Sequence, residues 1–471
     1  MKIRKLIKSL PYPIEKSIRY IYSLVPPKIR YGEAFWTTYN LLKESQYWTR
    51  ERIENYQLTE LNKLLNYAYK NVPYYNKVFK EIMLKPDDVQ NFNDLKKIPF
   101  LTKEIIRKNV DDLVSKKYPP KELKFVTTGG STGTPMGFYA EEKKYFEKEW
   151  AFMVNQWNRV GYHFGSKSVV LRGSIIRKNK PARYWDYDPI FRNLFLSTYH
   201  MNEETLPEYI KIIRDFKPEF IWNYPSAVTI LAKFMKINDI KPFKSVKALL
   251  CGSENLYPLQ RELFEEVFNC RVYSWYGHTE QVVLAGECEN SHYYHIFPEY
   301  GFVELVNNGR VIHDDNEIGE VVATGFNNYA FPFIRYKTMD IAKYKKYNCS
   351  CGRNYRLFEK IEGRTQDLIV TKDGRLITLT ALIFAQHFDS FSRLKEMQIV
   401  QEKKGEIFIN IVKSREFLND DENEIAARIH NAVGDGLKIN FKFVNSIPRT
   451  KNGKMSFLIQ KLPINFNEFN A

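Results

Sequence analysis

The middle of the chain alternates short strand patterns with helical patterns, and this alternation constrains the fold more than any other feature. Residues 168–173, SVVLRG, are a β-branched apolar run, whereas residues 206–216, LPEYIKIIRDF, space their apolar positions as a helix does. The theme recurs, with strands expected over 219–226, 246–252 and 270–277 and a helix over 258–268. Because strands that alternate with helices build a largely parallel sheet with helices on its faces, we predict an α/β fold.

The flanking regions predict further elements. A long helix is expected from residue 49 to a stop at Pro73, and Ser226 is placed to cap the helix after the second strand pattern. Beyond residue 300 the pattern changes to strands separated by turn residues, expected at 301–306, 319–325 and 331–336.

Composition excludes several classes of protein. The formal charge of +16 is spread along 471 residues, without an RNA-binding signature or zinc-finger spacing, so no nucleic-acid partner is expected. There is no apolar run of about 18 residues and no secretory signal, which favours a cytoplasmic protein. The five cysteines are too unevenly spaced for a disulfide framework, and the sequence carries no signal for an oligomeric state.

The first thirty residues are strongly basic, with Glu15 as their lone acid and apolar residues interleaved among the basic ones. Such a segment can lie on an anionic membrane surface, which would make the protein peripheral at the inner face of the membrane. A solvated helix packed on its own domain explains the same pattern equally well. The basic residues are Lys2, Arg4, Lys5, Lys8, Lys16, Arg19, Lys28 and Arg30.

A loop at 125–139, FVTTGGSTGTPMGFY, is rich in glycine and hydroxyl side chains and follows a strand-like run. Glycine lets the backbone approach a ligand closely, and Ser and Thr add donors, so the loop suits an anion such as phosphate. A simple turn would have a similar composition. The loop lacks the lysine and hydroxyl of the GxxxxGK[ST] nucleotide-binding pattern.

Four more motifs follow in order: YGHTE at 276–280, RYKTMD at 335–340, GRTQD at 363–367 and IPRTKNGK at 447–454. Together with the loop, they resemble the adenylate-forming superfamily of acyl-CoA ligases and related adenylation domains. Residues 45–75, 220–228 and 249–256 are similar to its phenylacetate–CoA ligase branch, and more closely to the CapK-like members from polysaccharide gene clusters.

This resemblance implies an adenylate-forming enzyme fold with two domains. Residues 1–362 would form a large N-terminal domain of mixed and parallel sheets with helices, which binds ATP and an acid. Residues 363–471 would form a small, mobile α+β C-terminal domain that carries Lys454 and turns on a hinge at 363–368.

The resemblance also implies that the loop binds the β- and γ-phosphates of ATP. Many relatives carry lysine where this chain has Met136, but the phenylacetate–CoA ligase branch commonly lacks that lysine. The loop residues expected to hold phosphate are Thr127, Thr128, Gly129, Gly130, Ser131, Thr132 and Gly133.

Further nucleotide contacts are implied by the later motifs, which taken alone would be ordinary turns at strand ends. Tyr276 would stack on the adenine beside Gly277. Thr279 would bind the α-phosphate, and Glu280 would hold Mg²⁺, a hard cation that prefers oxygen ligands. The remaining contacts would be Gly252, Ser253 and Glu254 beside the adenine, Asp340 on the ribose hydroxyls and Arg364 near the ribose.

Lys454 is the implied catalytic cation, because attack of a carboxylate on ATP concentrates negative charge that a placed ammonium stabilises. Lys451 is a nearby competitor, and a solvated lysine in a basic turn is the alternative reading of either residue.

Three cysteines and a histidine form a separate candidate group. Cys288, His295, Cys349 and Cys351 would supply a tetrahedral Zn²⁺ set, with His292 as an alternative fourth ligand. The residues alone leave reduced structural cysteines about as probable, and the resemblance favours a closed structural zinc site.

The function implied by the resemblance is ATP-dependent activation of a carboxylic acid to an acyl-adenylate, with transfer to coenzyme A. The alternatives are transfer to a sugar amine or hydroxyl in surface polysaccharide biosynthesis, or a non-catalytic nucleotide-binding relative. The acid pocket is expected to use residues 222–227 and the surroundings of Trp275, with His278 and Arg172 near the substrate. Aromatic residues there favour an aromatic or small hydrophobic acid.

Overall fold

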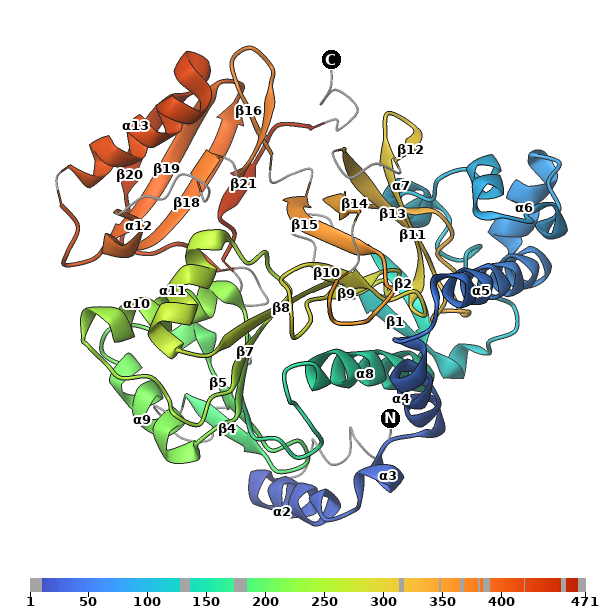
Figure 1. The fold of residues 1–471 in the computed structure, drawn as a ribbon, viewed down its shortest axis with the longest axis horizontal. Helices are drawn as coiled ribbons and strands as arrows, with labels where there is room; N and C mark the ends of the chain where they lie inside the picture. The colour runs from blue at the N-terminus through green and yellow to red at the C-terminus, as the bar shows by residue number, and fades with distance from the viewer. Residues whose placement is uncertain are drawn as a thin grey trace. The chain divides into compact units, whose positions relative to one another are not determined.

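The structure is a computed structural model (Figure 1) that describes residues 11–127, 136–172, 184–312, 317–346, 349–364, 368–379, 382–383, 390–418, 420–449 and 455–464. The chain divides into two compact units. The first comprises residues 1–32, 160–274 and 367–462, and the second comprises residues 33–159, 275–366 and 463–471. The expected domain boundary after residue 362 stays a prediction.

The first unit contains the predicted parallel sheet. Its strands lie in the order β4-β5-β3-β6-β7-β8, in which only β4 is antiparallel to its neighbour. Their bounds are β3 Ser168–Leu171, β4 Trp185–Asp188, β5 Asn193–Leu196, β6 Phe220–Asn223, β7 Ala248–Cys251 and β8 Arg271–Gly277, the last crossing into the second unit. Helices α9 (Leu206–Phe216), α10 (Pro225–Ile237) and α11 (Pro258–Phe268) pack on this sheet through a shared apolar core.

A second sheet of the first unit is formed by the C-terminal residues. Its strand order is β20-β19-β18-β21, and α13 (Asp421–Val433) packs on it through Ile425 and Ile429. The bounds are β18 Leu394–Lys403, β19 Glu406–Lys413, β20 Lys438–Phe443 and β21 Leu458–Gln460, with α12 at Ser390–Arg393 and the small pair β16 Leu368–Val370 and β17 Leu376–Thr378.

The second unit is built on antiparallel strands in the order β12-β11-β13-β14-β15-β10-β9, which continue from the end of β8. Their bounds are β9 Leu284–Gly286, β10 Tyr294–Ile296, β11 Gly301–Asn307, β12 Arg310–Ile312, β13 Ile318–Gly325, β14 Tyr336–Lys345 and β15 Leu357–Arg364. A separate hairpin joins β1 Leu123–Thr127 to β2 Gly137–Glu141. The helices are α4 Glu33–Ser45, α5 Arg50–Asn71, α6 Pro73–Glu81, α7 Lys103–Lys108 and α8 Glu142–Asn158.

The α/β prediction is confirmed, and the helices at 206–216 and 258–268 occur with the predicted bounds. The expected strand at 331–336 is wrong, since β14 begins only at Tyr336. Arg335, just before it, has a left-handed backbone with φ of 49°, which breaks the extended run.

Two expected helix ends also need revision. Pro73 ends α5 as predicted, but it also begins α6, because proline at the first helical position loses no hydrogen bond. The expected cap by Ser226 is wrong: α10 starts at Pro225, and the Ser226 hydroxyl bonds to Glu254 instead. In the described part of the chain, no helix is both long and apolar enough to cross a bilayer.

Candidate active site and metal centre

Several predicted site residues lie outside the described part of the chain. Thr127 is described: it is the exposed last residue of β1 and pairs with Gly137. Met136, just beyond the loop, is 1% exposed in the core of the second unit, with its sulfur 4.0 Å from the Tyr336 hydroxyl. The undescribed residues are Thr128, Gly129, Gly130, Ser131, Thr132, Gly133 and Lys454, together with the side chain of Arg364.

In the second unit, a side chain at the end of β8 contacts a residue of β14, although β9, β10 and β15 lie between the two strands in the sheet order. The Tyr276 hydroxyl donates to Oδ2 of Asp340 at 2.7 Å, and the Asp340 side chain is buried. The Asp340 N–H donates to the Thr338 hydroxyl at 3.1 Å, which helps to fix the backbone at this point of β14. Two residues that are 64 positions apart in the sequence are therefore brought into direct contact.

Glu280 lies in the turn that follows β8 and is 6% exposed. One carboxylate oxygen accepts from the Tyr336 hydroxyl at 2.8 Å, and the other lies 3.6 Å from Nδ1 of His278. Thr279 is exposed, and its carbonyl accepts from the Tyr145 hydroxyl of α8. The turn therefore exposes Thr279 to solvent, whereas the carboxylate of Glu280 is buried and held by the Tyr336 hydroxyl.

A half-buried carboxyl on α8, near this turn, was missed by the sequence reasoning. Glu149 lies one helical turn after Tyr145 on α8 and accepts from the Tyr300 hydroxyl at 2.5 Å. Burial raises the pKa of Glu149 to about 7, although the bond from Tyr300 opposes this rise. An acid on an otherwise apolar helix face was the only sequence signal.

The ion pair of Arg335 and Glu304 was also missed, although Arg335 opens the RYKTMD motif. Both side chains are 4% exposed, and Nε and Nη2 of Arg335 each lie 3.0 Å from a carboxylate oxygen of Glu304. The pair supports the start of β14, the strand that carries Asp340. Arg335 is thus a structural part of the motif.

In the first unit, polar side chains gather where the parallel strands end. Arg172 follows β3, and its guanidinium carbon lies 4.5 Å from the Trp222 ring and 5.0 Å from the Tyr224 ring. Nη2 of Arg172 donates to the hydroxyl of Ser253, which follows β7. Nε of Arg172 is buried and has no hydrogen-bond partner among the described residues. Ligands of open α/β sheets characteristically bind at the carboxyl ends of such strands.

Glu254, in the same region, binds the N-terminal end of α10. Its carboxylate accepts from the Ser226 N–H at 2.9 Å and from the Ser226 hydroxyl at 3.0 Å, at the start of α10. A carboxylate at a helix N-terminus is stabilised by the free N–H groups and the helix dipole. Gly252, just before it, is buried.

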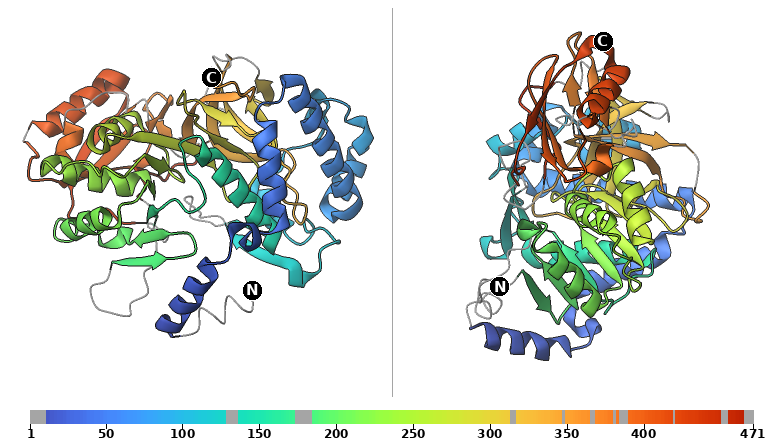
Figure 2. Two further views of the ribbon diagram at one scale, coloured as in Figure 1. Left: turned by 60° about the horizontal axis from the view of Figure 1, so that its bottom comes forward. Right: turned by 90° about the vertical axis from the view of Figure 1, so that its left-hand side faces the viewer.

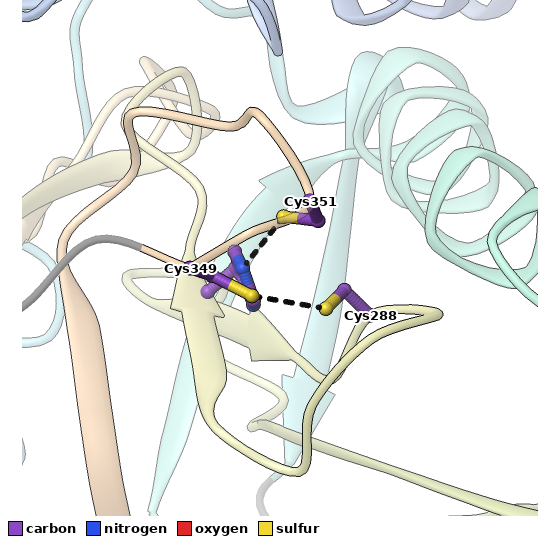
Figure 3. Close-up of side chains that lie close together, drawn as sticks. Cys288, Cys349 and Cys351 are labelled. Carbon is purple, nitrogen blue, oxygen red and sulfur yellow. Dashed lines mark hydrogen bonds between the residues drawn. The ribbon is translucent and has the colours of Figure 1, made fainter.

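Three cysteines and a histidine converge in the second unit (Figure 3). The ligand atoms of Cys288, His295, Cys349 and Cys351 all lie within 4.8 Å of one another. The sulfurs of Cys288 and Cys349 are 3.5 Å apart, and Nε2 of His295 is 3.2 Å from the sulfur of Cys351. Sulfur ligands of a tetrahedral Zn²⁺, at about 2.3 Å from the metal, stand about 3.8 Å apart, so the donor set fits this ion.

The surroundings of the cluster orient its donors. Nδ1 of His295 lies 3.1 Å from the Tyr293 carbonyl, which leaves Nε2 directed at the sulfurs. The neighbouring Cys288 thiol, with help from Arg353, lowers the pKa of Cys351 to about 6. His292, the alternative ligand, instead lies 3.3 Å from Glu287. The donor group among the described residues thus contains His295 and does not contain His292.

The chain is similar to known proteins over most of its length. Protein CapK of Staphylococcus aureus is 29% identical over 84% of this chain and 87% of its own length, and residues 369–461 match the CapK C-terminal domain family. The phenylacetate-coenzyme A ligase of Aromatoleum evansii is 26% identical over 70% of this chain and 74% of its own length. The chain is therefore similar to CapK and to the phenylacetate-coenzyme A ligases over most of its length, and its C-terminal residues match the CapK C-terminal domain family.

Further comparisons agree. The phenylacetate-coenzyme A ligase of Thermus thermophilus is 24% identical over 86% of this chain and 96% of its own length. A crystal structure of 2-hydroxyisobutyryl-CoA ligase in complex with R3-HIB-AMP has a TM-score of 0.71 and 19% identity, covering 89% of this chain and 93% of that one. At this identity the likeness shows the fold, and the predicted adenylate-forming fold is confirmed.

Proposed function

We propose that the chain activates a carboxylic acid with ATP, releasing pyrophosphate, and then transfers the acyl group from the acyl-adenylate to coenzyme A. The observation that carries this proposal is the buried Asp340 carboxylate beside the Tyr276 hydroxyl, within the ordered series of adenylation motifs. Its relatives named phenylacetate-coenzyme A ligase support the same activity.

The nucleotide is held by residues of different kinds. The Asp340 carboxylate accepts hydrogen bonds from the ribose hydroxyls, and the Tyr276 ring stacks on the adenine while its hydroxyl orients the carboxylate. The Thr279 hydroxyl contacts the α-phosphate. The phosphate loop, Gly252–Glu254, Arg364 and Lys454 keep the roles expected from the resemblance, as predictions.

Glu280 is the proposed Mg²⁺ ligand, since a carboxylate and phosphate oxygens suit this hard cation. When bound, the ion would neutralise phosphate charge. Tyr336 holds one oxygen of Glu280 at 2.8 Å and so sets the direction of the carboxylate.

In the first step a carboxylate oxygen of the acid attacks the α-phosphorus, and the bond to the bridging oxygen breaks. Pyrophosphate leaves with the bonding electrons, and no proton needs to be moved. Lys454 stabilises the negative charge that gathers on the α-phosphate oxygens. In the second step the coenzyme A sulfur attacks the acyl carbon, AMP leaves, and the thiol proton is lost to solvent.

The acid binds, in this proposal, where the parallel strands of the first unit end. Arg172 offers a buried Nε without a hydrogen-bond partner among the described residues, and its guanidinium lies close to the Trp222 and Tyr224 rings. The aromatic rings match the expected aromatic or small hydrophobic acid, and the guanidinium holds a polar or anionic group on that acid.

A second acceptor class is favoured by the match of residues 369–461 to the CapK C-terminal domain. In this alternative the acyl group passes to an amine or hydroxyl of a sugar during surface polysaccharide biosynthesis. The first step would be unchanged.

The Cys/His cluster is proposed to hold one structural Zn²⁺. All four ligands come from the protein, which leaves no open position for a catalytic water. The metal would tie the turn after β9 to the segment before β15.

The test is acid-dependent ATP–pyrophosphate exchange with pooled aryl, fatty, hydroxy and amino acids. Exchange with one pool, weakened in Asp340→Asn and unchanged in the exposed control Asp215→Asn, supports the proposal. ATP binding by calorimetry without exchange for any pool would overturn it in favour of a nucleotide-binding relative. Coenzyme A and sugar amines added to the active pool then distinguish the acceptors.

A further inference from the structure

The N-terminal helices expose an unusual amount of apolar surface. They are α2 (Tyr12–Ser23), the dark blue helix at the bottom of both views in Figure 2, and α3 (Pro27–Arg30). At 3.6 residues per turn, Ile14, Ile21 and Leu24 fall on one side of α2. The large apolar side chains exposed here are Ile14 at 50%, Tyr20 at 61%, Ile21 at 66%, Tyr22 at 43%, Leu24 at 71% and Ile29 at 73%.

The opposite side of α2 is fixed to the first unit. Nη2 of Arg19 lies 2.6 Å from a carboxylate oxygen of Asp188 at the end of β4, and Glu15 is buried beside it. Nη1 of Arg30 donates to the Ile190 carbonyl at 2.6 Å. The helix is therefore attached by its polar side, which leaves its apolar side directed outward.

The charge around this surface has one sign. Residues 1–32 contain eight Lys and Arg and a single acid, Glu15, which is buried against Arg19. Among the described residues 11–32, the apolar side chains are accompanied by the half-buried Lys16 and the exposed Lys28, and Glu15 is the single acid. A large exposed apolar patch is unfavourable in water, whereas an anionic bilayer surface accommodates apolar, tyrosine and basic side chains together.

We propose that α2 and α3 dock the protein on an anionic lipid surface. The apolar side of α2 lies in the headgroup region, and Lys16 and Lys28 contact lipid phosphates. A second copy of the chain is a poorer occupant of this surface, because two like-charged segments would meet without an acid between them.

The experiment is sedimentation of the full chain with vesicles of phosphatidylglycerol and phosphatidylcholine, against vesicles of phosphatidylcholine alone. We expect binding to the anionic vesicles only, weakened by salt. The double variant Ile21→Ser/Leu24→Ser should bind at least about tenfold more weakly, because two apolar side chains no longer leave water. Lys16→Gln/Lys28→Gln should also bind more weakly. Met83→Ser, which changes a side chain 91% exposed elsewhere, is the matched control and should bind as the parent does.

Three outcomes would overturn the proposal: no binding of the parent to anionic vesicles, equal binding of the Ile21→Ser/Leu24→Ser variant, or a dimer in solution that this variant dissolves. The last would assign the surface to a second copy. Circular dichroism and the unfolding midpoint of each variant show whether it is folded. The result does not depend on whether any acid is found to support exchange.

Discussion

Replacing Arg335 with methionine is expected to remove one half of the most fully buried ion pair described in the second unit. Its guanidinium bonds both oxygens of Glu304 at 3.0 Å and donates to the Ile98 carbonyl at 2.7 Å. The Phe100 ring lies 4.3 Å from its central carbon. Methionine keeps much of the volume and has the same backbone preferences at a φ of 49°, so the change isolates the charge.

The expected cost follows from the charge that is left behind. Glu304 would remain 4% exposed without its cation, and breaking a buried pair in this way costs about 3–5 kcal/mol. The lost bond to the Ile98 carbonyl adds about 1 kcal/mol. The double variant Arg335→Met/Glu304→Met carries no stranded charge, and it should recover most of the loss.

The assay is urea unfolding at pH 7, monitored by tryptophan fluorescence. The free energies of unfolding are compared between variants whose dependence on urea concentration has the same slope. Arg310→Met is the matched control, because its pair with Glu317 is 67% and 32% exposed and should contribute at most about 1 kcal/mol. If Arg335→Met costs no more than Arg310→Met, or if the double variant is no more stable than the single one, the buried-charge reasoning is refuted.

Four other results are expected. Asp340→Asn should raise KM for ATP at least about tenfold, measured by pyrophosphate exchange, because a charge-assisted bond is worth about 1.5–3 kcal/mol. Elemental analysis should find one Zn²⁺ bound per chain, lost in Cys349→Ser and kept in Cys270→Ser, which changes a cysteine outside the cluster. The native Glu149 carboxyl keeps its proton up to about pH 7, whereas the unfolded chain releases it near 4.5, so the parent should lose stability as pH rises between these values. Glu149→Gln should lack this loss in urea midpoints measured across that range. Arg172→Met should raise KM for the acid while KM for ATP is unchanged.

Much of the local structure could be predicted from the sequence. The helices at 206–216 and 258–268 were predicted to the residue, because an apolar period that matches the helix is a local property of the chain. The motif series also named Asp340 and Glu280 as site residues, and the structure places Asp340 within β14 and Glu280 in the turn after β8. Prediction was wrong where a tertiary contact overrides the local pattern: the run at 331–336 is broken by Arg335, and Ser226 serves Glu254 instead of a cap.

The candidate site itself could be predicted only as a set of residues. The contact between Tyr276 and Asp340 depends on how the strands from β8 to β14 are ordered in the sheet, and a single sequence does not specify that order. Hydrophobic periods act over a few residues, whereas hydroxyl-to-carboxylate contacts depend on how strands are ordered. The ion pair of Arg335 and Glu304 could not be predicted either, because it too joins residues from different strands or loops.

By itself, then, the sequence determined the alternation of strands and helices, the adenylation motifs and a candidate set of zinc-type donors in which His292 was an alternative to His295. Only the tertiary structure decided how the donors meet. β10 pairs with β9 on one side and β15 on the other, so His295 stands between Gly286 and Leu357, and Cys288 and Cys351 reach it from the adjoining turns. Likewise, the N-terminal sequence allowed either a buried or an outward apolar face, and the ion pair of Arg19 with Asp188 turned that face toward solvent. In both cases the local sequence is compatible with more than one arrangement, and a contact between residues far apart in the sequence stabilises the one observed.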